Sequence, residues 1–162
     1  MAGRRRGWGE GGLALAVVAV LASACGYGLA AHAELPPGVD RVAVRPFENL
    51  SSEPELGATV AAALRRELAR QGAEGEGGAV LTGEVRASEP APSTPGAVTW
   101  RIGIEVRARL AVAGAPGSER TLRRETDYLA GVDALETEGR RALALRRLAD
   151  EVARDLLAEL GR

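Results

Sequence analysis

Cysteine, histidine and lysine are almost missing from this sequence, which has one cysteine, Cys25, one histidine, His32, and no lysine among its 21 basic residues. A single cysteine excludes a disulfide within the chain, and together with one histidine it cannot complete a zinc site of the usual ligands. Aromatic residues make up only 3% of the sequence, so a core must be built mainly from Leu, Val, Ile and Ala. The exclusive use of arginine is most simply explained by a GC-rich coding bias, which also favours Ala and Gly.

The N-terminal segment has the three parts of a secretory signal peptide. Residues 4–6 are arginines, residues 13–21 are almost entirely Leu, Ala and Val, and small residues 22–24 precede Cys25. The apolar run is too short to span a bilayer, which needs about 20 such residues. We therefore predict that residues 1–24 are a signal peptide and are removed.

The lone cysteine distinguishes between two kinds of processing. The sequence Ala22-Ser23-Ala24 could be the cleavage site of a plain secretory signal, but a free thiol in a secreted domain is a reactive liability. Cleavage before Cys25 followed by acylation of its sulfur would remove that liability. Lipoprotein signals prefer Leu at the position that Ala22 occupies, and Leu21 lies one residue earlier. We predict a lipoprotein acylated at Cys25.

Acylation would anchor the mature chain at a membrane. One chain gives only marginal binding, at about 0.8 kcal/mol per buried methylene, whereas bacterial lipoproteins carry two or three. The residue after the cysteine is Gly26 rather than Asp, which under a common Gram-negative sorting rule permits export to the outer membrane. We expect a lipid-anchored protein of the outer membrane, with residues 25–40, rich in Pro, Gly and small residues, as its tether.

The mature chain is long enough for one domain, which we place at residues 41–162. It retains 18 basic and 21 acidic residues, a net charge of −3. Nucleic-acid-binding domains are usually strongly basic, so we predict no nucleic-acid partner.

The first half of this domain predicts a strand, a helix and a second strand. Residues 41–45 alternate valine with arginine as a half-buried strand does. Residues 52–55 have the S-x-x-E spacing of a capping box, with Pro54 suited to the first turn. Apolar residues then recur at every fourth position until Gly72, and residues 79–87 form the next strand. A right-handed crossover would make the two strands parallel.

The second half predicts a hairpin and a long helix. Residues 98–112 have apolar side chains at even positions and polar ones at odd positions, and residues 120–129 return antiparallel after a Gly-Ala-Pro-Gly turn. The proline-rich residues 88–96 are expected to form a loop. A helix should begin near Asp133, with Glu136 as its capping partner, and end at residue 160. The predicted fold is α/β (α+β), with a four-stranded mixed sheet, two helices on one face and the order β-α-β-β-β-α.

Several segments together resemble one known family. They are Cys25-Gly26-Tyr27-Gly28, residues 35–39 leading into Arg41-Val42-Ala43-Val44-Arg45-Pro46-Phe47-Glu48-Asn49, the Glu-Pro-Glu-Leu helix start, residues 80–85 and the Arg-Arg-Ala-Leu stretch of the last helix. In this order and spacing the sequence resembles the LPS-assembly lipoprotein family, LptE, over nearly all of the mature chain. The resemblance implies a plug inside an LptD-type outer-membrane β-barrel, which helps the barrel fold and helps pass lipopolysaccharide to the cell surface.

Arginines on the sheet are the candidate contacts for lipopolysaccharide, because clustered guanidinium groups suit bidentate capture of phosphate. The candidates are Arg86, Arg101, Arg107, Arg109, Arg123 and Arg124. Arg124 fits least well, since its parity matches Leu122 rather than the polar face. The alternative is a solvated sheet face on which Glu84, Glu105 and Glu125 partly neutralise the arginines.

No set of residues predicts catalysis. The glycine-rich residues 72–78 lack the Gly-Lys-Ser/Thr ending of a phosphate loop, and paired glutamates at the helix starts suit capping. His32 falls in the tether without a second ligand. We expect neither an enzyme nor a cofactor or metal.

Two other functions remain open. The Val-Ala-Val-Arg-Pro-Phe-Glu-Asn-Leu-Ser stretch also resembles the opening of curli-secretion and TolB-type domains, which usually continue with further strands and helices or a propeller. This alternative, an outer-membrane lipoprotein of a secretion or envelope-integrity system, predicts a homo-oligomer or a peptidoglycan-associated complex. A periplasmic lipoprotein enzyme is a third reading, with no residue constellation to support it.

Overall fold

The structure is a computed structural model that describes residues 35–95 and 98–160. All described residues belong to one compact unit, residues 32–162. The predicted signal peptide, Cys25 and His32 lie outside the described residues. The elements, in chain order, are β1 Val42–Val44, β2 Glu48–Asn49, α2 Leu56–Arg70, β3 Ala79–Ala87, β4 Ala91–Pro92, β5 Thr99–Val112, β6 Ser118–Leu129 and α3 Ala134–Leu160.

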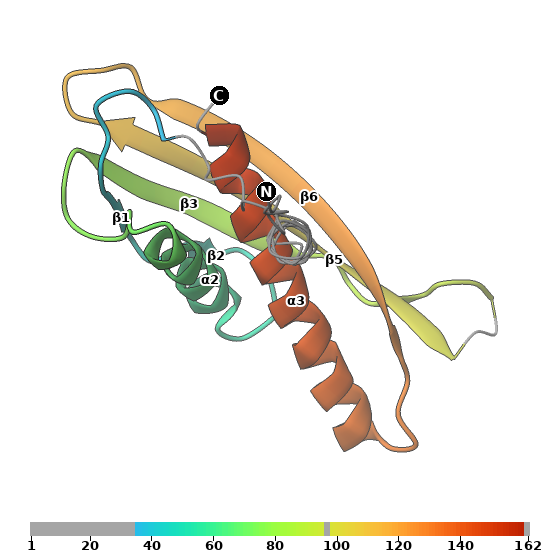
Figure 1. Cartoon of the computed structure of the whole chain (residues 1–162). Helices are drawn as coiled ribbons and strands as arrows, with labels where there is room; N and C mark the ends of the chain where they lie inside the picture. The colour runs from blue at the N-terminus through green and yellow to red at the C-terminus, as the bar shows by residue number, and fades with distance from the viewer. Residues whose placement is uncertain (1–34, 96–97, 161–162) are drawn as a thin grey trace, which may run out of the picture. The chain divides into compact units, whose positions relative to one another are not determined.

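The six strands form one mixed sheet, in which β3 and β5 are central (Figure 1). β1 pairs parallel to β3, as the crossover predicted, and β5 pairs antiparallel to both β3 and β6. β5 has 14 residues and is the longest strand, so it extends about 46 Å at roughly 3.3 Å per residue. The α/β class, with its two helices and mixed sheet, is confirmed.

The predicted count of four strands is wrong, because the sheet also contains β2 and β4, which have two residues each. Pro46 ends the pairing of β1, and the chain then rejoins the same edge of β3, where Glu48 lies opposite Glu84. β4 lies inside the proline-rich segment predicted as a loop, and it pairs Ala91 with Arg101. Segments this short have no room for an alternating pattern, so periodicity could not reveal them.

Both helices pack on the same face of the sheet (Figure 1). α2 lies against β1, β2 and β3, and α3 lies against β5 and β6. The core between the layers is aliphatic, as the scarcity of aromatic residues required. Its largest fully buried side chains are Leu64, Leu68, Leu81, Ile102, Ile104, Leu110, Leu148, Leu156, Leu157, Val42, Val60 and Val85.

Phe47 closes this core next to β3. It is 5% exposed, and its ring lies over Gly83. A β-carbon at Gly83 would lie 2.5 Å from Phe47 Cε1 and 2.3 Å from the carbonyl oxygen of Arg107. Glycine at this position therefore lets the aromatic ring and the neighbouring strand approach β3.

The predicted capping box of the first helix is wrong. α2 begins at Leu56, after Pro54, and the residue before it, Glu55, has φ of 60° and forms no side-chain cap. The Ser52 hydroxyl donates to Glu89 Oε1 at 3.5 Å instead of to the helix. Tertiary partners of this segment therefore override its local capping pattern. The predicted end at Gly72 agrees with the structure, where the helix ends at Arg70 and Gly72 has φ of 71°.

None of the helices within residues 35–95 and 98–160 is long and apolar enough to cross a membrane.

Candidate functional site: the open face of the sheet

The face of the sheet opposite α2 and α3 is covered by no described helix and carries most of the predicted site residues. Even-numbered residues of β5 point into the core, so its odd-numbered residues face the other way. The strand registers continue this face onto β3 and β6. Its exposed arginines are Arg86, Arg101, Arg107, Arg109 and Arg123. We call this surface the open face.

The registers set these side chains in rows across three strands. One row contains Arg86, Glu105 and Arg123, and the next contains Glu84, Arg107 and Thr121. Acidic residues alternate with the arginines, and six lie on this face: Glu48, Glu84, Glu105, Glu119, Glu125 and Asp127. Five arginines therefore face six carboxylates, and the open face is densely charged but nearly balanced.

Three of the five arginines are held in exposed ion pairs. Arg101 contacts Asp127 at 2.8 Å, Arg107 contacts Glu119 at 3.2 Å, and Arg123 contacts Glu125 at 2.7 Å. The Arg101 guanidinium hydrogen-bonds to the Asp127 carboxylate and lowers the pKa of that carboxyl, while the same contact raises the pKa of Arg101. Solvent screens exposed pairs of this kind, so they contribute little to stability and a ligand could displace them at little cost.

Arg86 and Arg109 are different, because neither forms an ion pair with another described residue. Arg86 lines two shallow hollows of about 150 and 180 Å³ on this face. Glu105 lines both hollows as well, Arg123 lines the first and Arg107 the second. The structure thus brings Arg86, Arg107 and Arg123 around one depressed area of the open face.

Gly103 lines the first hollow, and sequence reasoning did not single it out. A β-carbon there would lie 2.8 Å from Glu125 Cγ. Ser88 Oγ accepts a hydrogen bond from the Gly103 N–H at 2.8 Å, and the Ser88 N–H donates to the Gly103 carbonyl at 2.9 Å. Gly103 occupies a position of β5 where the alternating pattern calls for a polar side chain. The presence of glycine there is the only feature of the sequence that could have drawn attention to this position.

Arg124 lies apart from the other candidates, on the side of the sheet that faces the helices. Its Nη2 contacts Asp155 of α3 at 2.7 Å. Even-numbered residues of β6 face the helices, as buried Leu122 and Tyr128 show. Arg124 therefore joins β6 to α3 and does not belong to the open face.

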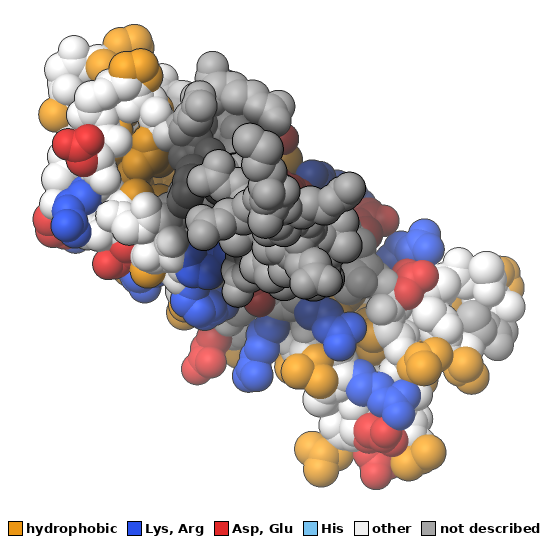
Figure 2. All heavy atoms as spheres, viewed as in Figure 1, with side chains coloured by type: hydrophobic (Ala, Val, Ile, Leu, Met, Phe, Trp, Pro, Cys, Tyr) orange, Lys and Arg blue, Asp and Glu red, His pale blue; other side chains and the backbone are white. Residues whose placement is uncertain are grey.

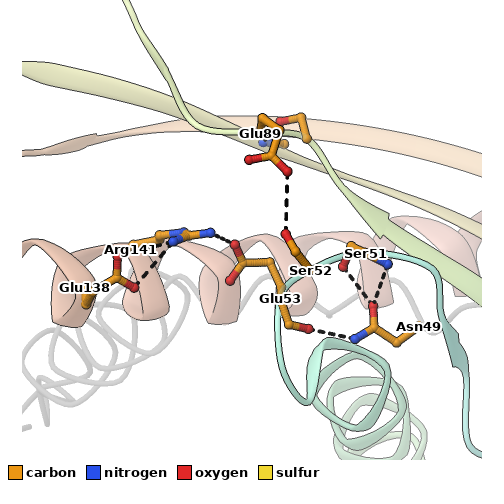
Figure 3. Close-up of polar contacts among 9 residues, drawn as sticks. Asn49, Ser51, Ser52, Glu53, Glu89, Glu138 and Arg141 are labelled. Carbon is orange, nitrogen blue, oxygen red and sulfur yellow. Dashed lines mark hydrogen bonds and ion pairs between the residues drawn. The ribbon is translucent and has the colours of Figure 1, made fainter.

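Sequence reasoning also missed a polar network between the two helical segments (Figure 3). Asn49 Nδ2 donates to the Glu53 carbonyl at 2.7 Å, and the Glu53 carboxylate pairs with Arg141 of α3. Glu138 contacts the same guanidinium at 3.2 Å. Glu53 is one of the paired glutamates expected at the helix starts, but its partner Arg141 lies 88 residues away in the sequence, so no local pattern could reveal the contact.

Metal-binding geometry does not emerge in the part of the chain that the structure describes. There, no group of three or more His, Cys, Asp or Glu side chains is arranged to hold a metal ion. The open face offers guanidinium donors and carboxylate acceptors over a broad surface. Such an arrangement suits binding to a large polar or phosphorylated partner.

Comparison with known proteins assigns the described domain to a family. The family model named LptE, for lipopolysaccharide assembly, matches residues 39–160. No curated protein matches the sequence.

Two solved structures share the fold, and a third is similar at a lower TM-score. A protein from Caulobacter crescentus CB15 described as a lipoprotein has a TM-score of 0.55 and 19% identity, covering 72% of this chain and 88% of its own. Protein XCC0632 of Xanthomonas campestris has a TM-score of 0.53 and 12% identity, covering 76% and 87%. The rare lipoprotein B of Shewanella oneidensis has a TM-score of 0.49 and 16% identity, covering 70% and 90%.

Proposed function

Since this chain belongs to the LptE family of lipopolysaccharide-assembly proteins, we propose that it plugs an LptD-type outer-membrane β-barrel. In that position it supports folding of the barrel and assists the insertion of lipopolysaccharide at the cell surface. The role is one of binding and scaffolding and requires no catalytic group.

The charge-balanced open face is the observation that carries this proposal. The interiors of outer-membrane barrels are polar, so a protein inside one needs a polar surface rather than an apolar one. The exposed, alternating arginines and carboxylates of the open face, such as Arg107 and Glu119, can exchange their weak mutual pairs for partners on a barrel wall. A balanced surface also avoids the cost of burying an excess of one charge.

Attachment to the membrane completes the proposed arrangement. Acylation of Cys25 after removal of residues 1–24 would hold the protein at the outer membrane, and residues 25–40 would join the lipid to the domain. The described chain starts beside the end of the sheet where Val42 lies opposite Ala79 and Ala79 opposite Val112. In this proposal the tether would enter the domain at the end of β5 where that strand finishes.

Phosphate groups of lipopolysaccharide are the proposed ligands of the open-face arginines. Arg86 and Arg109 are the first candidates, because they form no described ion pair that a phosphate must displace. Arg101, Arg107 and Arg123 would follow by releasing their exposed carboxylate partners. Arg124 is held by Asp155 on the other side of the sheet and is not needed.

Affinity isolation from detergent-solubilised membranes tests the barrel partner. We expect one abundant, detergent-stable β-barrel to copurify in equal amount with the wild-type protein. The double variant Arg107→Glu with Arg109→Glu should reduce recovery of the barrel. Both substitutions replace a positive charge by a negative one and so disturb the charge balance of the open face. Arg147→Glu, at an exposed position of α3, is the matched control and should leave recovery unchanged. Recovery of a homo-oligomer or a peptidoglycan-associated complex without a barrel would support the secretion or envelope-integrity alternative.

Direct binding of purified protein to lipopolysaccharide tests the phosphate contacts separately. Arg86→Glu with Arg109→Glu should weaken binding more than Arg147→Glu, and removal of the lipid phosphates should abolish the difference between these variants. Equal binding by all variants would exclude the open-face arginines as ligands.

A further inference from the structure

The two edges of the sheet are built differently. β1 and β2, which pair along β3, have three and two residues and are separated by Pro46. β6 runs along β5 for 12 residues without a proline, Ser118–Leu129, and no other described strand pairs with its outer side (Figure 1). Short strands and prolines protect an edge from pairing with another strand, and β6 has neither. We call the outer side of β6 the free edge.

The hydrogen bonds of the sheet show which backbone groups of β6 point outward. The register between β5 and β6 contains no bulge from Thr99 opposite Leu129 to Leu110 opposite Ser118. The Ala130 N–H continues this ladder and donates to the Val98 carbonyl at 2.7 Å. Because bonding alternates along an antiparallel pair, even-numbered residues of β6 direct their N–H and C=O groups toward β5. The odd-numbered residues direct theirs outward, and these are Glu119, Thr121, Arg123, Glu125, Asp127 and Leu129.

Two side-chain contacts support this assignment. Arg120 Nη1 donates to the Glu119 carbonyl at 2.9 Å, and Arg124 Nη1 donates to the Arg123 carbonyl at 2.9 Å. Both acceptors belong to odd-numbered residues, so these carbonyls are reached from outside β5. The six outward N–H groups have no acceptor among residues 35–95 and 98–160, and all six residues are exposed.

An extended polypeptide backbone is the ligand that fits the free edge. The outward N–H groups recur at every second residue, about 6.6 Å apart at roughly 3.3 Å per residue. The carbonyls of another strand recur at the same spacing, whereas a phosphate or a sugar offers no such series. Pairing of an extended segment with a free strand is a common mode of peptide recognition. The exposed bonds from Arg120 and Arg124 can be replaced by those of the arriving strand.

A second copy of this chain is a poor occupant, because like charges would meet. Two copies of β6 related by a two-fold axis pair antiparallel and set the central residue opposite itself. Centring on Arg123, Arg124 or Glu125 therefore places two like charges directly opposite each other. Centring on Leu122 sets Arg120 opposite Arg124. Like charges in such positions destabilise a strand pair.

The charge of the free edge selects a basic segment instead. Three of the six outward residues are acidic, Glu119, Glu125 and Asp127, and one, Arg123, is basic. Acidic and basic side chains lie along this side of the domain in Figure 2. A strand beside β6 places every second side chain opposite these residues on the open face. Arginine or lysine there would meet an excess of negative charge, whose present ion pairs are exposed and weak.

We propose that the free edge of β6 binds an extended segment of a protein partner, in which basic residues alternate with uncharged ones. The segment adds a strand to the six-stranded sheet. This pairing does not rest on the barrel function proposed above. Inside a barrel the segment would come from a loop, because the strands of a closed wall have both edges paired.

Binding of a synthetic peptide tests the backbone pairing. The probe is the capped peptide Thr-Arg-Val-Arg-Thr-Arg-Val-Arg-Thr, and the protein is the mature chain with Cys25→Ser. In the complex the peptide arginines lie opposite the outward residues and exchange backbone hydrogen bonds with them. N-methylation of two arginines should weaken binding by about tenfold or more. N-methylation of both valines, whose N–H groups point away from β6, should change it little. Both modified peptides have the same charge, so equal affinities overturn the proposal.

Amide hydrogen exchange measured by NMR locates the peptide. The N–H groups of Thr121, Glu125 and Asp127 should exchange quickly in the free protein and slowly in the complex, whereas those of Leu122 and Thr126 should be slow in both. Unchanged exchange at the odd-numbered positions overturns the proposal. Slow exchange there in the free protein also overturns it. Dependence of that protection on protein concentration would identify a second copy as the occupant, and independence would identify a segment of the same chain.

A proline on the free edge gives a test within the protein. Thr121→Pro removes an outward N–H that makes no bond to β5, so the fold should persist while peptide affinity falls about tenfold. Thr121→Val keeps the N–H and is the matched control. Full affinity in a folded Thr121→Pro variant contradicts the proposal, and the methylated peptides decide the question if that variant does not fold. These measurements need no barrel, so their failure leaves the proposed barrel function to the isolation experiment.

Discussion

Arg141 of α3 pairs with Glu53, which lies in the loop that leads into α2 (Figure 3). The two side chains are only 20% and 10% exposed, whereas Glu138, the other partner of this guanidinium, is 64% exposed. This largely buried pair holds the loop before α2 against α3. It therefore connects two segments that are far apart in the sequence.

Removal of one member of this pair should be costly. Glu53→Gln leaves the Arg141 charge partly buried without its main partner, and we expect a loss of about 3 kcal/mol in the free energy of unfolding. Glu138→Gln at the exposed partner is the matched control and should cost less than about 1 kcal/mol. Urea denaturation monitored by circular dichroism measures both values. Equal losses would mean that burial does not distinguish the two contacts.

Two glycines offer a paired test of packing. Gly83→Ala should destabilise the protein by about 1–3 kcal/mol, because the new methyl group meets Phe47 and the backbone of β5. Gly139→Ala, on an exposed position of α3 with nothing within 4 Å of the added carbon, should stabilise it by about 0.5–1 kcal/mol. Thermal unfolding of both variants checks the opposite signs, and a stabilised Gly83→Ala variant would show that Phe47 can move away freely.

The contact of α3 with the sheet should depend on its buried leucines. Leu148 is fully buried, so Leu148→Ala should cost about 2–5 kcal/mol through lost burial and the cavity that remains. Leu143→Ala, at a position 53% exposed on the same helix, should cost less than about 1 kcal/mol. Chemical denaturation measures the loss of stability in each variant. A larger loss for Leu143→Ala than for Leu148→Ala would contradict the orientation of α3 described above.

Glu136 makes the start of α3 sensitive to acid. Its hydrogen bond from the Val132 N–H, together with the Arg140 side chain, lowers the pKa of its carboxyl below the ordinary 4.5. Because the folded-state pKa is the lower one, the carboxylate stabilises the fold above pH 4.5, and this contribution is lost as pH falls through the lowered pKa. Glu136→Gln should therefore lower the Tm at pH 7, and its difference from wild type should shrink below pH 4.5. A difference that stays constant from pH 7 to pH 3 would contradict this assignment.

Strands and helices with a long repeating pattern were predictable from the sequence. The predicted limits of β3, residues 79–87, agree with the structure, and alternation in β5 correctly separated Ile102, Ile104 and Val106 from Arg101, Arg107 and Arg109. These predictions succeeded because the period of a strand or helix decides which side chains can be buried together. The two-residue strands β2 and β4 were missed, since pairing with an existing strand created them.

The candidate site was predictable only in part. Parity placed Arg101, Arg107 and Arg109 on one face of the long strand and cast doubt on Arg124, which the structure pairs with Asp155. The sequence could not show that Arg86 stands in one row with Glu105 and Arg123, because that row depends on the register between three strands. Nor could it show that Val132 and Leu135 would remain exposed, since apolar residues near a helix start usually contribute to the core.

For this protein the sequence by itself determined the α/β class, the aliphatic core and the composition of each sheet face, because hydrophobic periodicity acts over neighbouring residues. Tertiary structure alone decided the rows of charge on the open face, the pairing of Glu53 with Arg141 and the exposure of Val132 and Leu135. Each of these depends on segments that lie far apart along the chain, or on a turn braced from several sides, and such contacts exist only after the helices have packed on the sheet.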